Sequence, residues 1–372
     1  MAGIYLHIPF CKSRCIYCDF FSSTALTLRE QYVEALKEEI ALRNNYLSDR
    51  EISSIYFGGG TPSLLTTKQI SEIIEHIRKH YKLTHACEIT IEANPSDVTL
   101  SYLRHLRQIG VNRLSIGIQT FNDTLLTFLR RRHDATTAQS AIENAKNAGF
   151  DNISIDLIYG IPCQTLQMLD DDLSKAIDAN VQHISTYCLT YEEGTLLTRQ
   201  LKQNKFQAID EDTLNDMADL IERSLCDKQY VHYEVSNYCL PDYHSRHNLA
   251  YWTDKQYLGL GAGAHSYDNK SRQWNICDIE KYINAVQARN LSYQKEVLTD
   301  IDKYNETIML ALRTQQGLEL KRLDESDRTY LIDKSRHFIT QELLQTDGNY
   351  LHATAKGLKI LDYITCQLMK SE

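Results

Sequence analysis

The sequence has few prolines, no long apolar run and no leader-like N-terminus. Only five prolines occur among 372 residues, and hydrophobic and charged residues make up 42% and 24%, values that exclude a disordered or fibrous class. No stretch of 18 apolar residues is present, and the N-terminal Met-Ala-Gly-Ile-Tyr has neither the basic region nor the apolar core of a signal peptide. We therefore expect a cytoplasmic protein.

The chain also lacks an excess of positive charge. Aspartate and glutamate number 49 against 40 lysines and arginines, so the net charge is −9 at pH 7. This balance creates no general attraction to nucleic acid or to an anionic membrane, and we expect no nucleic-acid partner. The length suits a large α/β domain followed by a smaller one.

Short apolar runs alternate with amphipathic segments of helical period over the first half of the chain. This alternation is typical of βα units with a parallel sheet. Six such units fit an incomplete TIM-like barrel, and an open doubly wound sheet would show the same alternation. The predicted strands are 4–8, 52–57, 88–93, 113–118, 153–158 and 183–189. The predicted helices are 28–46, 67–81, 99–109, 123–129, 136–148 and 165–179, with Thr66 or Thr67, Thr99 and Thr136 as caps.

The alternation fades after residue 195. The stretch 229–275 is rich in tyrosine and histidine, contains both tryptophans and has no clear period. So many aromatic residues in one irregular stretch indicate a floor or lid over a cavity.

The C-terminal part has the order helix, helix, hairpin and helix, with Gly348 at the turn between two short strands, and it resembles a winged-helix unit. Its predicted helices are 302–314, 327–343 and 354–369. We therefore predict an α/β fold whose smaller C-terminal region is α+β. The predicted segments are a barrel core at 1–195, a completing aromatic segment at 196–298 and a winged-helix-like domain at 299–372.

Three of the ten cysteines form a cluster near the N-terminus. Cys11, Cys15 and Cys18 have C-x3-C-x2-C spacing on a loop that can turn three thiolates toward one metal centre. Thiolates select zinc or iron–sulfur clusters. A closed zinc site needs a fourth ligand, for which His7 and Asp19 are poorly placed, whereas a cubane held by three cysteines leaves one iron open. We favour a [4Fe–4S] cluster and take the remaining cysteines to be small buried residues.

A run of glycines, Y-F-G-G-G-T-P-S, follows the second predicted strand. Gly59, Gly60 and Thr61 lie where exposed backbone groups could meet a ligand, although an ordinary tight βα turn would have the same composition. The run lacks the Gly-Lys-Ser/Thr ending of a phosphate loop and the G-x-G-x-x-G pattern of a dinucleotide loop.

The cysteine motif, with the aromatic Tyr17 before its third cysteine, is similar to that of the radical S-adenosylmethionine superfamily. This resemblance implies a partial (β/α)6 barrel and a [4Fe–4S] cluster whose open iron binds S-adenosylmethionine. The reduced cluster cleaves the sulfonium in such proteins and releases methionine and a 5′-deoxyadenosyl radical. Their glycine loop, here Gly59, Gly60 and Thr61, binds the methionine end of the cofactor.

Four further motifs match the sub-group typified by oxygen-independent coproporphyrinogen III oxidase. Read singly, their polar residues could be helix caps, a turn residue and a solvated helix end. The resemblance instead implies contacts with S-adenosylmethionine, to which Tyr5 and Tyr17 are added. The matching residues are Glu92 in I-E-A-N-P, Gln119 in S-I-G-I-Q-T-F-N, Arg131 in the basic run and Asp156 in D-L-I-Y-G-I-P.

Two features divide this sub-group. Phe20 stands where the oxidases have a further cysteine, and only ten residues precede Cys11. The motif H-N-L-A-Y-W from His247 to Trp252 instead resembles that of the HemW-type heme chaperones. An imidazole can ligate heme iron beside a flat aromatic wall, so His247 is the expected heme contact, with His244 and His265 as substitutes. The alternative is a histidine held by hydrogen bonds in a buried loop.

The resemblance implies a heme chaperone more than an enzyme. Its cofactors would be a [4Fe–4S] cluster, S-adenosylmethionine and heme. Its partners would be hemoproteins that receive heme, an electron donor such as flavodoxin or ferredoxin, and a membrane surface touched peripherally near acceptors. The alternative is an oxygen-independent coproporphyrinogen III oxidase, which decarboxylates porphyrinogen propionates by radical chemistry.

Overall fold

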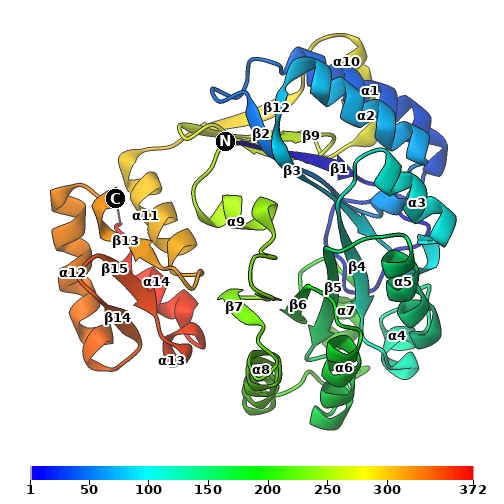
Figure 1. Ribbon diagram of the computed structural model, residues 1–372. Helices are drawn as coiled ribbons and strands as arrows, with labels where there is room; N and C mark the ends of the chain where they lie inside the picture. Colours follow the sequence, from blue (N-terminus) through cyan, green and yellow to red (C-terminus); the bar gives the residue numbers. More distant parts are fainter. Residues whose placement is uncertain (1, 372) are drawn as a thin grey trace.

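A sheet of twelve strands curls into an open ring in this computed structural model, which describes residues 2–371 (Figure 1). Its order is β12-β11-β10-β9-β1-β2-β3-β4-β5-β6-β8-β7, and the central pairs from β9 to β6 are parallel. The bounds are β1 Ala2–Ile8, β2 Glu51–Gly59, β3 Lys82–Ala93, β4 Arg113–Gln119, β5 Ile153–Tyr159, β6 His183–Cys188, β7 Val231–Glu234, β8 Asn237–Cys239, β9 Tyr257–Leu260, β10 His265–Tyr267, β11 Ser271–Asn275 and β12 Tyr293–Val297. The predicted partial barrel is therefore confirmed.

Alternation along each central strand separates two faces. In β1, Ile4, Leu6 and Ile8 point to the helices and are fully buried, while Tyr5 and His7 line the inside of the ring. Successive side chains of a strand point to opposite faces, so the apolar set forms the large core and the polar set remains for the interior. The ring therefore presents polar side chains inward.

Helices cover the outer face of the ring, and α9 lies on its inner side (Figure 1). The bounds are α1 Arg29–Leu42, α2 Thr67–His80, α3 Leu100–Gln108, α4 Asp123–Phe128, α5 Ala135–Asn147, α6 Leu166–Asp178, α7 Leu196–Lys202, α8 Glu211–Cys226, α9 Arg246–Trp252 and α10 Ile279–Gln287, with 3-10 turns η1 Leu26–Leu28, η2 Pro62–Leu64 and η3 Pro95–Asp97. Thr66 and Thr99 cap α2 and α3 as predicted. The predicted cap Thr136 is wrong, because α5 begins earlier and the Asp134 carboxylate accepts from the backbone N–H of Thr137.

The stretch 229–275 is not irregular, and this expectation is wrong. It contains α9 and five short strands, which extend the sheet at both ends. β8 pairs with β6 and β7 with β8, whereas β9 pairs parallel to β1, whose residues lie about 250 positions earlier. Strands of three to five residues carry too little periodicity to be read from sequence.

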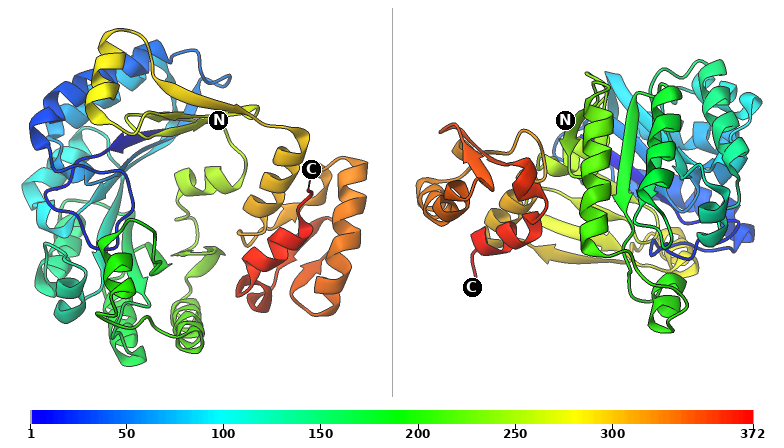
Figure 2. Two further views of the ribbon diagram at one scale, coloured as in Figure 1. Left: turned by 180° about the vertical axis from the view of Figure 1, so that it is seen from behind. Right: turned by 90° about the horizontal axis from the view of Figure 1, so that it is seen from below.

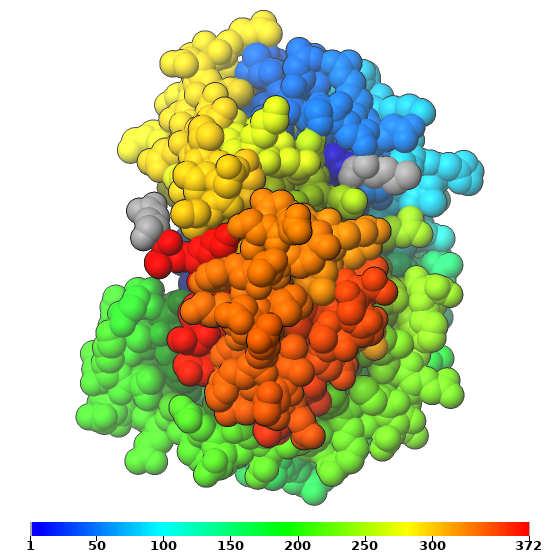
Figure 3. Space-filling model, turned by 90° about the vertical axis from the view of Figure 1, so that its left-hand side faces the viewer, coloured from blue at the N-terminus to red at the C-terminus, as the bar shows by residue number. Residues whose placement is uncertain are grey.

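The C-terminal unit has its own core and a three-stranded sheet of order β13-β15-β14. It stands beside the opening of the ring and covers the middle of one face of the molecule (Figures 2 and 3). The predicted helix 354–369 is two helices. The bounds are α11 Asp300–Ala311, β13 Leu318–Glu319, η4 Leu320–Arg322, α12 Glu325–Thr340, β14 Leu344–Thr346, β15 Tyr350–Ala353, α13 Ala355–Leu358 and α14 Leu361–Leu368.

These elements agree with the predicted winged-helix-like unit. Residues 196–298 extend the same sheet and share the large core with the first segment. The bounds of the three segments, at 195 and 298, stay a prediction.

The C-terminal unit also closes the ring. α11 follows β12 after two residues, and the chain after α11 pairs with β7 at the opposite edge of the sheet. The Val235 N–H donates to the carbonyl of Arg313 at 3.1 Å, and the Gln315 N–H donates to the carbonyl of Tyr233 at 3.0 Å. The two edges of the sheet are therefore joined through α11.

A buried carboxylate ties α1 to the far edge of the sheet. Glu39 is fully buried and accepts from Arg43 Nε at 2.9 Å, from Asn275 Nδ2 at 2.7 Å, from the Tyr282 hydroxyl at 2.7 Å and from the Gly261 N–H at 2.8 Å. Four donors replace the water that burial removes from this charge. Glu39 therefore fixes α10 and the β9–β10 turn against α1.

We expect Glu39→Ala to lower the free energy of unfolding by about 3 kcal/mol or more, because Arg43 loses its buried counter-charge. Urea denaturation followed by circular dichroism measures this change. Glu38→Ala is the matched control on the same helix, because the Glu38 side chain is 44% exposed and pairs with Arg289 at 3.6 Å; we expect a loss below about 1 kcal/mol. Equal losses in both variants would contradict a structural role for the buried pair.

Candidate functional site

A cavity of about 630 Å³ opens at the carboxyl ends of the central strands. Ligands of barrel proteins bind at this end, where the loops after the strands meet. Eight of the nine residues predicted to contact S-adenosylmethionine line it: Tyr17, Gly59, Gly60, Thr61, Glu92, Gln119, Arg131 and Asp156. The structure thus brings together residues that are up to 139 positions apart in the chain.

The cysteine loop borders this cavity and is tied down at both sides. The Cys11 N–H donates to the carbonyl of Ser23 at 2.9 Å. Lys12 and Arg132 both form ion pairs with Asp97, at 2.9 and 2.7 Å. Burial alone would raise the pKa of the Asp97 carboxyl, but the hydrogen bonds from Arg132 and Lys12 outweigh it and hold the pKa below its usual value. The ion pairs with Asp97 therefore fix the cysteine loop to its neighbours.

Cys18 lines the cavity, and the thiols of Cys15 and Cys11 lie close enough to act on its charge. Burial raises the pKa of the Cys18 thiol to about 11, although a backbone hydrogen bond at Phe20 lowers it, and the neighbouring Cys15 and Cys11 raise it further. Thr61 Oγ1 donates to Cys11 Sγ at 3.4 Å, and Arg131 Nη1 donates to Cys15 Sγ at 3.4 Å. Donors at the sulfurs stabilise thiolates that hold an iron–sulfur cluster.

Three thiols on one loop form the donor set that the predicted [4Fe–4S] group requires, because each cysteine of a cubane binds a different iron. Within residues 2–371, no three histidine, cysteine, aspartate or glutamate side chains lie close enough together to hold one metal ion. The chemistry of these thiols, with hydrogen-bond donors at Cys11 and Cys15, fits the predicted group, and the group itself stays a prediction.

The backbone conformation of Gly59 and the close packing at Gly60 both favour glycine in this loop. Gly59 has a φ of +106°, which favours glycine. A Cβ on Gly60 would lie 2.8 Å from the carbonyl oxygen of Phe10 and 2.9 Å from that of Ile8, both on the segment that leads into Cys11. A larger residue at position 60 would therefore displace the cysteine loop itself.

Glu92 lies at the end of β3 under the glycine loop. Its carboxylate accepts from the Tyr56 hydroxyl at 2.9 Å and from the Gly59 N–H at 3.1 Å. Burial raises the pKa of this carboxyl to about 7, although the Tyr56 hydrogen bond lowers it. A cationic group bound in the cavity would restore the charged form, so this site suits the ammonium of an amino acid.

Gln119 and Arg131 form the opposite wall. Gln119 has a φ of +70° where the register between β4 and β5 shifts, and such a bulge redirects a side chain. Arg131 donates to the carbonyl of Gly117 at 2.6 Å and to the Tyr17 hydroxyl at 3.4 Å. Asp156 accepts from Ser115 at 3.3 Å, and burial raises the pKa of its carboxyl. Arg131 thereby links the cysteine loop to the sheet.

Comparison with known proteins identifies the family. The family model of the Radical SAM superfamily matches residues 5–176, and that of the HemN C-terminal domain matches residues 298–360. The heme chaperone HemW of Lactococcus lactis subsp. lactis (strain IL1403) is 34% identical over 362 residues, which cover 96% of this chain and 94% of that protein. The chain belongs to the HemW family of radical SAM proteins.

Other similarities agree with this family. HemW of Escherichia coli (strain K12) is 37% identical over 266 residues, 71% of this chain and 69% of that protein. In a search of solved structures, E. coli coproporphyrinogen III oxidase (HemN), described as a radical SAM enzyme, has a TM-score of 0.85 at 24% identity and covers 99% of this chain and 90% of that one. The latter likeness concerns the fold alone.

Two predicted site residues of this HemW-family chain lie outside the cavity. Tyr5 lines a neighbouring cavity, with its hydroxyl 3.1 Å from His7 Nδ1. His247 is 1% exposed; its Nδ1 lies 2.9 Å from Ser54 Oγ and its Nε2 2.9 Å from the Tyr251 hydroxyl. Both ring nitrogens of His247 are thus occupied, so iron ligation would require the bond to Tyr251 to break. This geometry favours the buried, hydrogen-bonded alternative.

The cavity also contains residues that the sequence analysis of this HemW-family chain missed. Ser115 on β4 and Tyr187 on β6 line it, as does Asn94 from the loop after β3. Phe20, which the sequence analysis used to separate two subfamilies, lines it as well. Ser115 alternates with the apolar Leu114 and Ile116 on β4, and this alternation could have identified it. No comparable signal marks Tyr187 or Asn94.

The length and composition of the helices are a further feature of the structure. Among residues 2–371, no helix has both the length and the apolar composition that crossing a membrane requires.

Proposed function

We propose that this chain binds a [4Fe–4S] cluster at Cys11, Cys15 and Cys18, binds S-adenosylmethionine in the adjoining cavity, and delivers heme to hemoproteins. The observation that carries this proposal is the convergence of the cysteine loop with Glu92 and Arg131 in one cavity, in a chain whose relatives are named heme chaperones. A flavodoxin or ferredoxin is the proposed electron donor, and hemoproteins at a membrane surface are the proposed acceptors.

Different residues of the cavity would bind the two ends of S-adenosylmethionine. Glu92, with Gly59 beside it, offers a carboxylate and backbone groups to an ammonium and a carboxylate. Asp156 lies across the cavity on β5, where it can accept from hydroxyl groups. When bound, the cluster supplies an open iron for the methionine end and a single electron for reduction of the sulfonium.

Arg131 fixes the position of the cysteine loop relative to the sheet. It is buried and donates to Cys15 Sγ, to the Tyr17 hydroxyl and to the carbonyl of Gly117, so it couples the cysteine loop to β4. A guanidinium holds several acceptors in a fixed planar geometry, which a lysine does not. The cavity therefore positions a ligand relative to the thiols rather than merely enclosing it.

Heme transfer is tested with the anaerobically reconstituted full chain. We expect it to bind hemin with a defined Soret band, to pass heme to an apo-hemoprotein, and to form no protoporphyrinogen from coproporphyrinogen III with reductant and S-adenosylmethionine. We expect no protoporphyrinogen because Phe20 stands where the oxidases have a further cysteine. Turnover of coproporphyrinogen III that depends on S-adenosylmethionine would refute the chaperone proposal and support the oxidase.

A further inference from the structure

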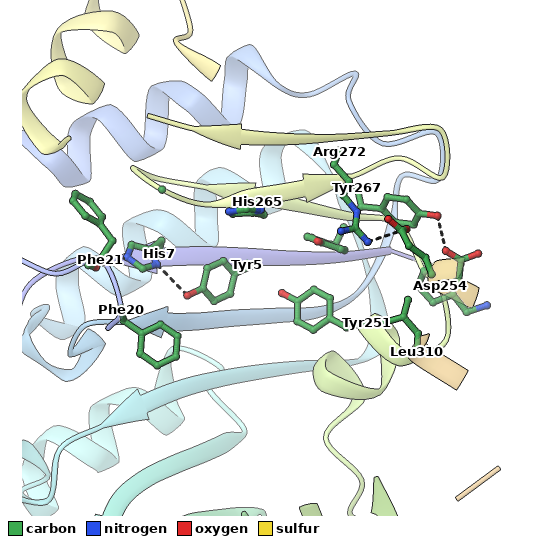
Figure 4. A pocket seen from close by; sticks show the side chains of 14 residues that line it. Tyr5, His7, Phe20, Phe21, Tyr251, Asp254, His265, Tyr267, Arg272 and Leu310 are labelled. Carbon is green, nitrogen blue, oxygen red and sulfur yellow. Dashed lines mark hydrogen bonds and ion pairs between the residues drawn. The ribbon is translucent and has the colours of Figure 1, made fainter. Parts of the chain in front are cut away.

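A second cavity, of about 480 Å³, adjoins the first and belongs to no part of the machinery described above. It lies between β1, β9, β10 and β11 of the sheet and α11 of the C-terminal unit (Figure 4). Phe20, 62% exposed, lines both cavities. The two sites therefore share a wall.

Aromatic rings form most of the inner surface of this cavity. Tyr5, Tyr251 and Phe20 face it from β1, from α9 and from the segment after Cys18 (Figure 4). Tyr257 of β9 and Tyr267 of β10 also line it. Tyr251 and Tyr257 meet edge to face, with ring centroids 4.6 Å apart. Flat apolar walls with a few polar groups suit a large planar ligand, and the volume lies in the range of small-molecule sites.

His265 presents an imidazole to this cavity in a form suited to ligation. Within residues 2–371, neither of its ring nitrogens has a hydrogen-bond partner, and its ring stacks on Trp274 with centroids 5.9 Å apart. Burial and then the nearby Arg272 charge lower the pKa of His265 below its usual value, which keeps the ring neutral at pH 7. His7 and His247 have both ring nitrogens engaged, so His265 differs from them.

The charged groups of the cavity leave one cation without a counter-charge. Glu306 is neutralised by Arg272 at 2.8 Å, and Asp254 accepts from the Tyr267 hydroxyl at 2.5 Å and lies 3.6 Å from Arg322. The Lys255 ammonium has no ion pair or hydrogen bond within the part of the chain that the structure describes. An anionic ligand group would therefore meet Lys255 at the rim.

We propose that this cavity holds an iron porphyrin, with His265 as an axial ligand of the iron and Lys255 paired with a carboxylate side chain of the macrocycle. The proposal rests on the proposed heme-carrier function and names the site for it. Heme would then lie against Phe20, in contact with the wall of the cofactor cavity.

The test is a hemin titration of the reconstituted full chain, run in parallel with metal-free protoporphyrin IX. We expect His265→Ala to shift the Soret band and to raise the Kd for hemin about tenfold or more, with little change for protoporphyrin IX, because only hemin has an iron to ligate. Lys255→Ala should weaken both ligands by a similar factor of about two to five, as expected for a rim ion pair.

His85→Ala is the matched control, since His85 is exposed on β3 and lies outside the cavity. Circular dichroism and the cluster absorbance check that each variant is folded and loaded. Hemin binding by the native chain with the same spectrum and affinity in His265→Ala would overturn this site while leaving the chaperone proposal intact. Absence of hemin binding by the native chain would overturn both.

Discussion

Cys15→Ala should reduce the iron and sulfide of the anaerobically reconstituted chain from about four of each per chain to near zero. Each of the three cysteines is expected to hold a different iron, so removing one leaves the cubane with two protein ligands. Cys15 also accepts the hydrogen bond from Arg131, so its loss leaves a buried guanidinium without one of its partners. Iron and acid-labile sulfide assays, with the absorbance near 400 nm, measure the result.

Cys11→Ala and Cys18→Ala should behave alike, since both thiols belong to the same loop. Cys366→Ala is the control, because Cys366 is exposed on α14 in the C-terminal unit. The expectation that the cysteines outside the motif are buried is therefore wrong for Cys366. Full cluster content in all three loop variants, or stoichiometric zinc in a native chain that takes up no iron and sulfide, would contradict the cluster assignment.

The second large expected effect is a loss of affinity for S-adenosylmethionine. We expect Glu92→Ala to raise its Kd about a hundredfold, close to 3 kcal/mol, while the cluster stays in place. The variant removes the proposed ammonium partner and also leaves the Tyr56 hydroxyl and the Gly59 N–H without an acceptor. Calorimetric titration of the cluster-loaded chain measures this affinity.

Glu75→Ala, at an exposed position of α2, is the control for Glu92→Ala. Replacement of Gly60 by valine is a poorer probe, because its Cβ would press on the carbonyls of Ile8 and Phe10 and disturb the cysteine loop as well as the cavity. An unchanged affinity in Glu92→Ala would remove this residue from the cofactor site.

The central barrel could be predicted because each strand alternates between two environments. Ile4, Leu6 and Ile8 must face helices, and the polar residues between them must face inward, so composition and period specify the strand and its burial. Glu92 and Asp156 could be assigned to one site because parallel strands end at the same edge.

The features that could not be predicted depend on contacts between residues far apart in the sequence. Nothing near β9 in the sequence indicates that it pairs with β1, and the sheet edge that lines the second cavity was therefore missed. The motif around His247 does not reveal the hydrogen bond of its ring to Ser54, because Ser54 is 193 positions away. Tyr5 lines the neighbouring cavity because the stagger between strands, not the alternation, decides the level of each side chain, and its contact with S-adenosylmethionine stays a prediction.

The closure of the ring through α11 makes one point of its circumference weaker than the pairs of central strands. β1 and β2 are joined over seven register pairs, whereas β7 meets the chain after α11 through two backbone hydrogen bonds, each worth about 1 kcal/mol net. Local opening follows the least stabilised contact, so this seam separates before any pair of central strands does. Because Glu306 and Leu310 of α11 line the second cavity, the same separation widens that cavity.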